Sequence, residues 1–415
     1  MITNLKITNC YTFNKTVEFS MKADMRTKRF YTNIYQGENN ENILKSSVIY
    51  GPNNTGKTSF VNCIKDIKNV LLNKKAHVSR DIFSNYKICE LEVSFLQKGE
   101  EYQYIFNYDS DKEEYVYEKF SKITQGKENV YYIKDTKNEE YKCSRDKDLA
   151  YILAISSKNN ILIYTIETEQ FPILKEVKEI LVSFANNIDI IDMNHIPNSK
   201  TIQFLKNKNN MTKKVVEFIK NADLYLENYA YDDKVKFNIA ASDEKITELV
   251  NEKLLKNQSF MEQIKLVSFY KGKAVPSMLF DSVGTKKIVA LASYVLDAIE
   301  NDRVLVVDEL DSSLHFKITR AIIGLFNNEK NRKGQLICTL HDVTLLDCKK
   351  MFRKEQIYFT AKDEKQTYLY SLREFTYNKE GIRTDTADML EKYEKGIFGA
   401  IPEPDLISCL LKEEK

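Results

Sequence analysis

The stretch GPNNTGKT, residues 51–58, constrains the fold of this chain more than any other feature. The chain has only 12 glycines in 415 residues, and two of them lie here. The pattern G-x-x-x-x-G-K-T forms a phosphate-binding loop where it joins a strand to a helix. Both flanks agree, because SSVIY (46–50) is rich in β-formers and KTSFVNCIKDIKNVLL (57–72) repeats apolar residues at helical spacing. The stretch therefore predicts a site for nucleotide phosphates.

Each residue type in this stretch has a physical role. The glycines permit a tight loop whose backbone N–H groups point at phosphate oxygens. Lys57 would reach the β- and γ-phosphates, and the Thr58 hydroxyl would ligate Mg²⁺, beside the partial positive charge of the helix start. We therefore expect ATP and Mg²⁺ as cofactors. The residues expected to hold the nucleotide here are Gly51, Asn53, Asn54, Thr55, Gly56, Lys57, Thr58 and Ser59.

A pair of acids late in the chain predicts the other half of the metal site. The apolar run VLVVDE (304–309) reads as a buried strand that ends in Asp308 and Glu309. Asp308 would face the metal through water, and Glu309 would act as general base on the attacking water. A buried strand that simply ends in solvated acids is the alternative. About 250 residues separate Lys57 from Asp308, and this long interval is the layout of ABC-type ATPases.

Two further positions fit that layout. DSVGTKK (281–287) opens a predicted helix just before the acid strand, where Ser282 and the Gly284 N–H could cap a γ-phosphate from its far side. An ordinary serine N-cap is the alternative. His341 ends the strand that follows the acids and could sense the γ-phosphate by hydrogen bonding, although a strand-end histidine can also be purely structural. His315 falls in the loop region after the acids.

The remaining chain predicts an α/β fold in three parts. Residues 1–146 hold the phosphate loop and a series of short β-rich runs, from 89 to 135, that read as an antiparallel meander. Residues 147–261 read as a mainly helical insertion. Residues 262–415 again alternate predicted strands and helices, and they carry the predicted helix start at 282, the acids and His341. The expected architecture is a P-loop NTPase of ABC-ATPase type, split by the helical insertion.

Composition excludes several classes of protein. A net charge of +2 gives no global electrostatic case for nucleic acid or anionic membrane. The seven cysteines form no CxxC pair and are odd in number, which favours reduced thiols in a cytoplasmic protein. No window approaches 18 apolar residues and the first residues alternate like a strand, so neither a membrane span nor a signal peptide is expected.

Four motifs in order, GPNNTGKT, SVGTK, VLVVDELDSSLH and TLHD, resemble those of the AbiLii-like AAA/ABC ATPases of bacterial antiviral loci. These are kin of the ATPase subunit of PARIS and, more remotely, of the OLD, RecF and Rad50 ATPases. The ending YEKGIFGAIP (393–402) is similar to the tail of that family. The resemblance spans both ends of the chain and leaves the insertion unmatched.

The resemblance implies both an assembly and a role. Two ATPase heads would sandwich two ATP molecules head to tail, with Ser282 and Gly284 of one copy facing the P-loop of the other. The chain would act as the sensor or scaffold of an antiviral system. It would respond to a phage-derived trigger and control a separately encoded toxic effector, typically a nuclease.

Two other functions remain open from the sequence. A DNA-maintenance ATPase like RecF would bind duplex DNA directly, with Lys206, Lys208, Lys213 and Lys214 as candidate contacts. An ABC protein of ribosomes or transporters would usually show two cassettes or a paired membrane protein. The chain departs from the ABC pattern in two ways: the signature is not LSGGQ, and no glutamine is convincing as the Q-loop residue, since Gln97 falls in a predicted hairpin turn.

Overall fold

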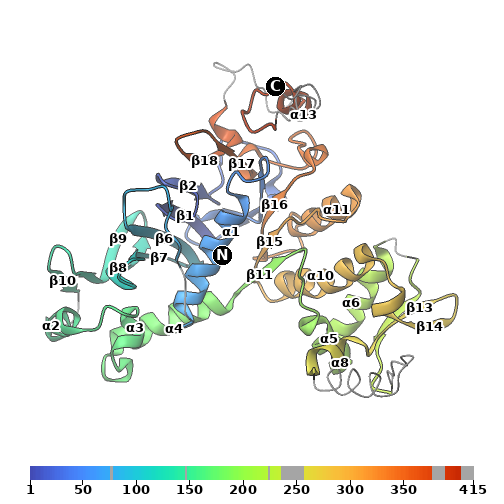
Figure 1. Ribbon diagram of the computed structural model, residues 1–415, viewed down its shortest axis with the longest axis horizontal. Coiled ribbons are helices and arrows are strands. Elements are labelled where there is room, and N and C mark those ends of the chain that lie inside the picture. Colours follow the sequence, from blue (N-terminus) through green and yellow to red (C-terminus); the bar gives the residue numbers. More distant parts are fainter. Residues whose placement is uncertain (75–77, 145–146, 223–224, 235–256, 376–387, 403–415) are drawn as a thin grey trace, which may run out of the picture.

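The computed structural model describes residues 1–74, 78–144, 147–222, 225–234, 257–375 and 388–402. Its centre is helix α1 (Lys57–Leu71), which lies between two large sheets (Figure 1). Apolar side chains at helical spacing bury the face of α1 that includes Phe60, Ile64 and Ile67. The phosphate loop that precedes this helix is therefore anchored in the main core.

One sheet is antiparallel and has the strand order β10-β9-β8-β7-β6-β1-β2. Its strands are β1 (Ile2–Thr8), β2 (Val17–Ser20), β6 (Ile88–Gln97), β7 (Glu100–Asp109), β8 (Glu114–Thr124), β9 (Lys127–Asp135) and β10 (Glu140–Cys143). Side chains alternate between buried and partly exposed along β7, as expected for a sheet with one covered face. The predicted meander is confirmed, and β1 extends it.

The other sheet carries the sequence motifs and has the strand order β11-β15-β16-β5-β17-β18. Its strands are β5 (Ser46–Tyr50), β11 (Ile188–Asp192), β15 (Val304–Asp308), β16 (Gln335–Leu340), β17 (Ile357–Lys362) and β18 (Thr367–Ser371). All neighbours pair in parallel except β17 and β18. The carboxyl ends of β5, β15 and β16 therefore meet at one edge, which is where parallel α/β sheets bind ligands.

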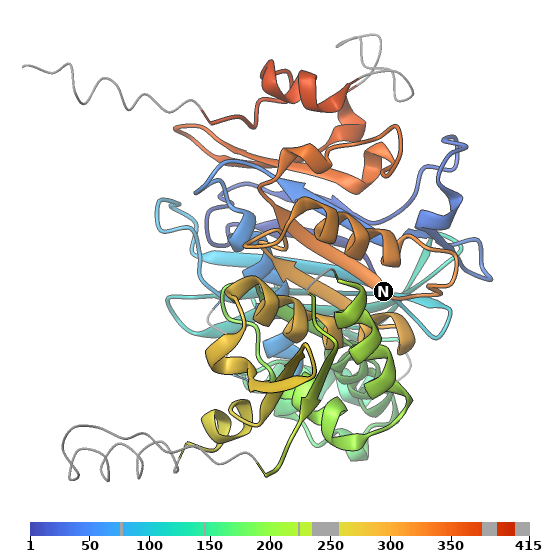
Figure 2. The same cartoon turned by 90° about the vertical axis from the view of Figure 1, so that its right-hand side faces the viewer.

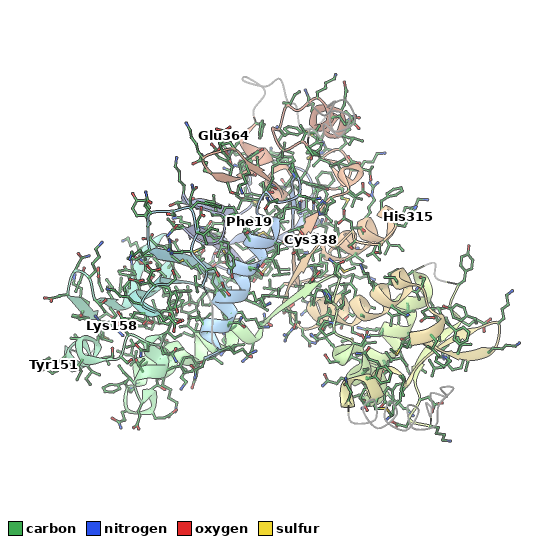
Figure 3. All side chains as sticks on the ribbon, viewed as in Figure 1. Phe19, Tyr151, Lys158, His315, Cys338 and Glu364 are labelled. Carbon is green, nitrogen blue, oxygen red and sulfur yellow. The ribbon has the colours of Figure 1, made fainter. Side chains whose placement is uncertain are left out.

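Helices cover both faces of the parallel sheet. With α1, helix α4 (Pro172–Asn186) fills the space between the sheets, and Pro172 occupies its first turn. Helices α10 (Val283–Glu300) and α11 (Phe316–Phe326) pack on the opposite face, in a second apolar core. Figure 3 shows Phe19 and Cys338 in the interior and Tyr151 and Lys158 at the periphery. The arrangement is the α/β P-loop fold of ABC type that the sequence predicts.

A third cluster lies beside the parallel sheet (lower right in Figure 1; also Figure 2). Its elements are α5 (Ser199–Asn207), α6 (Asn210–Asn221), β12 (Asn228–Tyr231), α8 (Gln258–Gln263), β13 (Leu266–Tyr270), β14 (Lys273–Pro276) and α9 (Ser277–Phe280). Helix α10 shares apolar residues with this cluster and with the second core. It therefore connects the two.

The range 147–261 contains more than helices. Helix α4 packs on α1, and β11 is the edge strand of the parallel sheet, paired with β15 from Ile188 to Asp192. Helices α2 (Lys147–Ile155) and α3 (Leu162–Thr165) also lie in this range. Outside it, the structure forms the short elements β3 (Ile34–Gln36), β4 (Asn42–Leu44) and α13 (Met389–Glu394). The domain limits at 146 and 261 stay a prediction.

The tail 393–402 folds onto β17 and β18, where Phe398 stacks on Phe359 with ring centroids 5.2 Å apart.

Phe184 of α4 stacks on Phe95 of β6, with ring centroids 3.9 Å apart, and so joins the inter-sheet helices to the antiparallel sheet. Phe184→Ala is expected to lower the free energy of unfolding by about 3–5 kcal/mol, because it leaves a cavity in the core. Urea denaturation followed by circular dichroism would measure the loss. Phe83→Ala is the matched control, since that ring is 84% exposed, and should change stability by less than about 0.5 kcal/mol. Equal effects of the two changes would contradict the packing described.

Candidate nucleotide site

The loop 51–56 turns sharply between β5 and α1, and its two glycines fit where other residues would clash. Gly56 caps α1 with φ of 99°, and an added Cβ would lie 3.0 Å from Thr12 Oγ1 and 3.0 Å from Thr367 Cγ2. A Cβ on Gly51 would lie 2.2 Å from Thr360 Oγ1. The loop is thus held between the turn after β1 and the β17–β18 hairpin. Because side chains have no room at the two glycines, the loop would contact an anionic ligand there through its backbone N–H groups.

Lys57 is buried within the loop that it follows. Its ammonium donates to the carbonyl oxygens of Gly51 (2.6 Å) and Pro52 (2.9 Å). Burial lowers the pKa of Lys57 below its ordinary value, while the nearby carboxylates, Asp308 first among them, oppose the shift. Both hydrogen-bond partners are neutral, so a phosphate anion at this position would stabilise the charged form of the lysine.

Thr58 and Asp308 meet although they are 250 residues apart in the chain. The Thr58 hydroxyl donates to Asp308 Oδ2 at 2.8 Å. A threonine hydroxyl and a carboxylate that lie side by side are oxygen ligands of the kind that Mg²⁺ prefers. The structure thus brings together the two residues expected to hold the metal, and the donor set fits Mg²⁺.

Thr339 of β16 holds both acids, and the sequence analysis missed it. Its hydroxyl donates to Asp308 Oδ1 at 2.6 Å and accepts the backbone N–H of Glu309 at 2.7 Å. Thr339 is fully buried. The only signal for it in the sequence is its place two residues before His341.

Glu309 sits between two side chains in a strained backbone conformation. Its φ of 56° lies in the left-handed region, which costs a non-glycine residue of order 1–3 kcal/mol. Asn194 Nδ2 donates to Glu309 Oε2 at 3.0 Å, and His341 Nε2 lies 3.6 Å from Glu309 Oε1. The carboxylate is partly exposed, so water can reach it.

Asn194 and Asp311 also belong to this site and were missed. Asn194 follows β11, inside the range read as a helical insertion, so no motif pointed to it. The Asp311 carboxylate accepts the backbone N–H groups of His341 (2.7 Å) and Asp342 (2.5 Å) through Oδ2. Its buried Oδ1 has no hydrogen-bond partner among the described residues. Asp311 therefore ties the loop after β15 to the end of β16.

The predicted signature turn lies against the loop after the acids. Ser282 caps α10 by accepting the N–H of Thr285 at 3.1 Å, the N-cap alternative that the sequence left open. An added Cβ on Gly284 would lie 3.0 Å from the carbonyl oxygen of Ser313. Lys287 of the same helix donates to Ser312 Oγ at 3.1 Å. In the described chain, no hydrogen bond joins Ser282 to the loop 51–56, so its predicted role stays a prediction.

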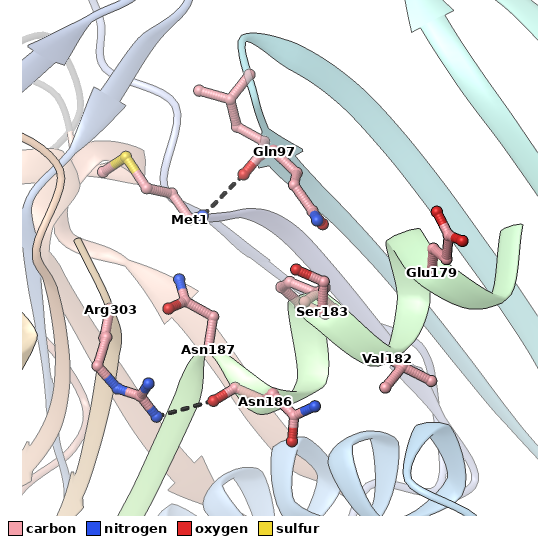
Figure 4. A pocket seen from close by; sticks show the side chains of 10 residues that line it. Met1, Gln97, Glu179, Val182, Ser183, Asn186, Asn187 and Arg303 are labelled. Atoms are coloured by element: carbon pink, nitrogen blue, oxygen red, sulfur yellow. Dashed lines mark hydrogen bonds between the residues drawn. The ribbon is translucent and has the colours of Figure 1, made fainter. Parts of the chain in front are cut away.

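Gln97 lies elsewhere, at the end of β6. With Met1, Asn187 and Arg303 it lines a pocket of about 490 Å³ (Figure 4). The Met1 amine donates to the Leu96 carbonyl at 2.9 Å, and burial lowers its pKa to about 5. Arg303 precedes β15 and Asp308 ends it, so this pocket lies at the opposite end of the strand from the acids. Gln97 therefore does not lie beside the nucleotide loop.

Two features are absent from the described residues. They contain no cluster of three or more histidine, cysteine or acidic side chains that could hold a metal on its own. Among them, no helix combines the length and the apolar character that crossing a membrane requires.

Comparison with known proteins identifies a family. Residues 46–347 match the family described as "AAA domain, putative AbiEii toxin, Type IV TA system". The match covers more than half of the chain and includes the phosphate loop, the acids and His341. A comparison with curated proteins finds no match.

Several solved structures are remotely similar. An SMC head domain from Thermotoga maritima has a TM-score of 0.42 and 12% sequence identity, over 89% of this chain and 98% of that chain. An Smc head bound to the C-winged helix domain of ScpA has a TM-score of 0.45 and 11% identity, over 89% and 97%. An Smc head domain with an extended coiled coil, bound to the C-terminal domain of ScpA derived from Pyrococcus furiosus, has a TM-score of 0.44 and 11% identity, over 89% and 96%.

Gly56→Ala tests the geometry of the loop without any ligand. The added Cβ meets Thr12 and Thr367 at a positive φ, so we expect a loss of about 1–3 kcal/mol in the free energy of unfolding. Gly324→Ala, on α11 with open space around it, is the control and should stabilise by about 0.5–1 kcal/mol. Thermal unfolding of the two variants side by side would show shifts of opposite sign. A Gly56→Ala protein as stable as wild type would mean that the loop is not held as described.

Proposed function

The chain belongs to the AAA-domain family of the AbiEii toxin type, and from this premise we propose that it binds ATP with Mg²⁺ and hydrolyses it. The observation that carries the proposal is the hydrogen bond between Thr58 and Asp308, which joins the phosphate loop to the acid strand across 250 residues. A P-loop and an acid of a neighbouring strand are the parts that phosphoryl transfer requires.

In this proposal each residue of the site has a role that follows from its position. Lys57 and the N–H groups of the loop hold the phosphates, and Thr58 with Asp308 holds Mg²⁺. When bound, the metal would neutralise charge on the phosphate oxygens. Glu309 accepts a proton from the attacking water. Thr339 fixes the backbone of Glu309, and Asn194 and His341 flank its carboxylate.

We further propose that the working unit is a homodimer of heads. Ser282 and Gly284 of one copy would complete the nucleotide site of the other, as ABC-type layouts require. The surface around Ser282 supports this, because Leu279, Phe280 and Val283 are 63%, 65% and 63% exposed. Apolar residues exposed together commonly mark a protein contact. ATP bound between two copies would favour the closed dimer, since it contacts both only in that state.

The biological role remains the proposal of a sensor or scaffold in an antiviral system. The motif resemblance to AbiLii-like ATPases supports it. The family description names a putative AbiEii toxin and a type IV TA system, and it names no sensor. A phage-derived trigger and a separately encoded effector, of nuclease type by that resemblance, belong to the same proposal.

Direct DNA binding, as in RecF-like ATPases, is less well supported. Of the four candidate lysines, Lys206 pairs with Glu262 and Lys214 pairs with Glu300 at 2.6 Å. Pairing reduces the positive charge available to phosphates. If duplex DNA bound tightly and its affinity fell steeply with salt, the DNA-maintenance function would be favoured instead.

Lys57→Ala and Glu309→Gln separate binding from hydrolysis. Lys57→Ala should weaken ATP binding by about tenfold or more, because hydrogen bonds to charged groups contribute about 1.5–3 kcal/mol. Glu309→Gln should bind ATP but lose about 10²–10⁴-fold in turnover, the usual range for a general base. Fluorescent-nucleotide titration, phosphate release and light scattering after gel filtration would measure binding, rate and dimer state.

The control for these variants is Lys392→Ala on α13, which should behave as wild type. Glu309→Gln with ATP and Mg²⁺ is expected to accumulate as a dimer, because hydrolysis no longer releases it. Wild-type turnover in Glu309→Gln would show that Glu309 is not the base. ATP binding unchanged in Lys57→Ala would contradict the assignment of the loop.

Thr339→Val tests whether the buried hydroxyl positions the acids. Valine keeps the shape of threonine but removes both hydrogen bonds, so kcat should fall by about tenfold or more with little change in KM for ATP. Thr339→Ser keeps the hydroxyl and should retain most of the turnover. Steady-state kinetics over a Mg²⁺ series, with the melting temperature of each variant, would separate positioning from folding. Equal kcat in the valine and serine variants would contradict the positioning role.

A further inference from the structure

A groove of about 850 Å³ lies between α6 and α11, with α10 at its base; we name it the α6–α11 groove. Its apolar lining comes from Phe218, Leu296, Ile318, Ala321, Ile322 and Leu325. Leu325 is 40% exposed, so part of the apolar lining is open to solvent. Figure 3 shows His315, which also lines the groove, at the outer end of α11. The groove is thus an apolar trough with two helical walls.

The rim of the groove is basic. Lys317 of α11 lines it together with Lys214 of α6. Lys213 and Lys220 line a neighbouring hollow on α6, which shares Glu217 and Asn221 with the groove. Within the described part of the chain, only Lys214 of these four pairs with an acid, namely Glu300. Glu217 is the acid among the lining residues. An occupant that matches this surface would be apolar on one side and acidic at its edges.

We propose that the α6–α11 groove binds an acidic amphipathic helix of a separate protein. Two helical walls around an apolar floor suit a third helix, which places apolar residues at i, i+3, i+4 and i+7 into the trough. Its flanking glutamates or aspartates would face Lys317 and, beyond the edge of the groove, Lys213 and Lys220. Duplex DNA fits less well, because phosphates would lie over an apolar floor. The surface around Ser282, assigned above to a second copy, is a different one.

The position of the groove connects it to the nucleotide site. Helix α11 starts at Phe316, a few residues after Glu309, and is capped by His315. Helix α6 packs on α10, whose Lys287 bonds the loop after the acids through Ser312. A helix in the groove would contact both walls and so respond to any movement of one wall against the other. This link to ATP, unlike the binding itself, rests on the proposed function.

The test is a selection from a phage-displayed library of helical peptides. Leucine is fixed at four positions of one helical face, and the remaining positions vary. Wild-type protein is the bait, and Ala321→Arg, an exposed position on α11, is the counter-selection because the arginine would fill the trough. We expect enriched peptides to be acidic and to lose at least about tenfold in affinity for Leu325→Glu. Ile82→Glu, at an apolar position that is 78% exposed and outside the groove, is the matched control and should bind as wild type.

A charge exchange sharpens the test. Lys317→Glu should weaken the best acidic peptide, and a peptide with one flanking glutamate changed to lysine should recover binding to that variant. Several results would overturn the proposal: no enrichment over the counter-selection, enriched peptides without acidic bias, or equal binding to wild type and Leu325→Glu. Displacement of the peptide by duplex DNA, or loss of self-association in Ala321→Arg, would assign the groove to DNA or to a second copy instead.

Repeating the titration with Lys57→Ala distinguishes this proposal from the proposed function. Peptide binding that persists in Lys57→Ala supports the groove whatever the fate of ATP hydrolysis. Peptide binding lost in Lys57→Ala, while that protein stays folded, would show that the groove does not bind on its own and would overturn the proposal as stated.

Discussion

The carboxylate of Asp308 is the point on which the site depends, because two hydroxyl groups from different elements converge on it. Thr58 on α1 donates to Oδ2 and Thr339 on β16 donates to Oδ1, at 2.8 and 2.6 Å. Hydrogen bonds to a charged acceptor contribute more than those between neutral groups. Helix α1 follows β5, so α1, β15 and β16 meet at this carboxylate only because β5, β15 and β16 are parallel strands side by side in one sheet. The fold and the site therefore depend on the same arrangement of strands.

The backbone near this carboxylate is constrained as well, both in the phosphate loop and directly after Asp308. Gly56 takes a positive φ under Thr12 and Thr367, and Glu309 takes one without being a glycine. Strain of this kind persists only where neighbouring contacts over-determine the conformation. For Glu309 the contacts are the hydroxyl of Thr339 at its N–H and Asn194 at its side chain. The strain therefore lies at the residue whose carboxylate must keep a fixed direction.

The sequence predicted those parts of the site that a local motif encodes. Lys57 and Thr58 were expected at the start of the helix after the loop, and they form the first turn of α1. Asp308 and His341 were expected at strand ends, and they lie at the end of β15 and directly after β16. Asn194 was missed because β11 is a five-residue strand within a helical pattern, and only its pairing with β15 makes it a strand. Apolar residues at helical spacing predict a helix from 211 to 229, with Thr212 as its N-cap. The structure instead begins α6 at Asn210, with Asn209 as cap, and forms β12 at Asn228–Tyr231, where pairing with β13 decides the conformation.

The third cluster is joined to the parallel sheet by charge as well as by apolar contact. Lys200 of α5 bonds Asp189 of β11 at 2.7 Å and Asp297 of α10 at 2.5 Å, and Arg303 bonds the same Asp189 at 2.9 Å. All four side chains are less than a quarter exposed. Removing one member would leave partly buried charges unpaired, which costs more than the pair itself contributes. Asp189 lies five residues before Asn194, so this network fixes the strand from which Asn194 reaches Glu309. The orientation of the third cluster and the geometry of the carboxylate are therefore set by the same few residues.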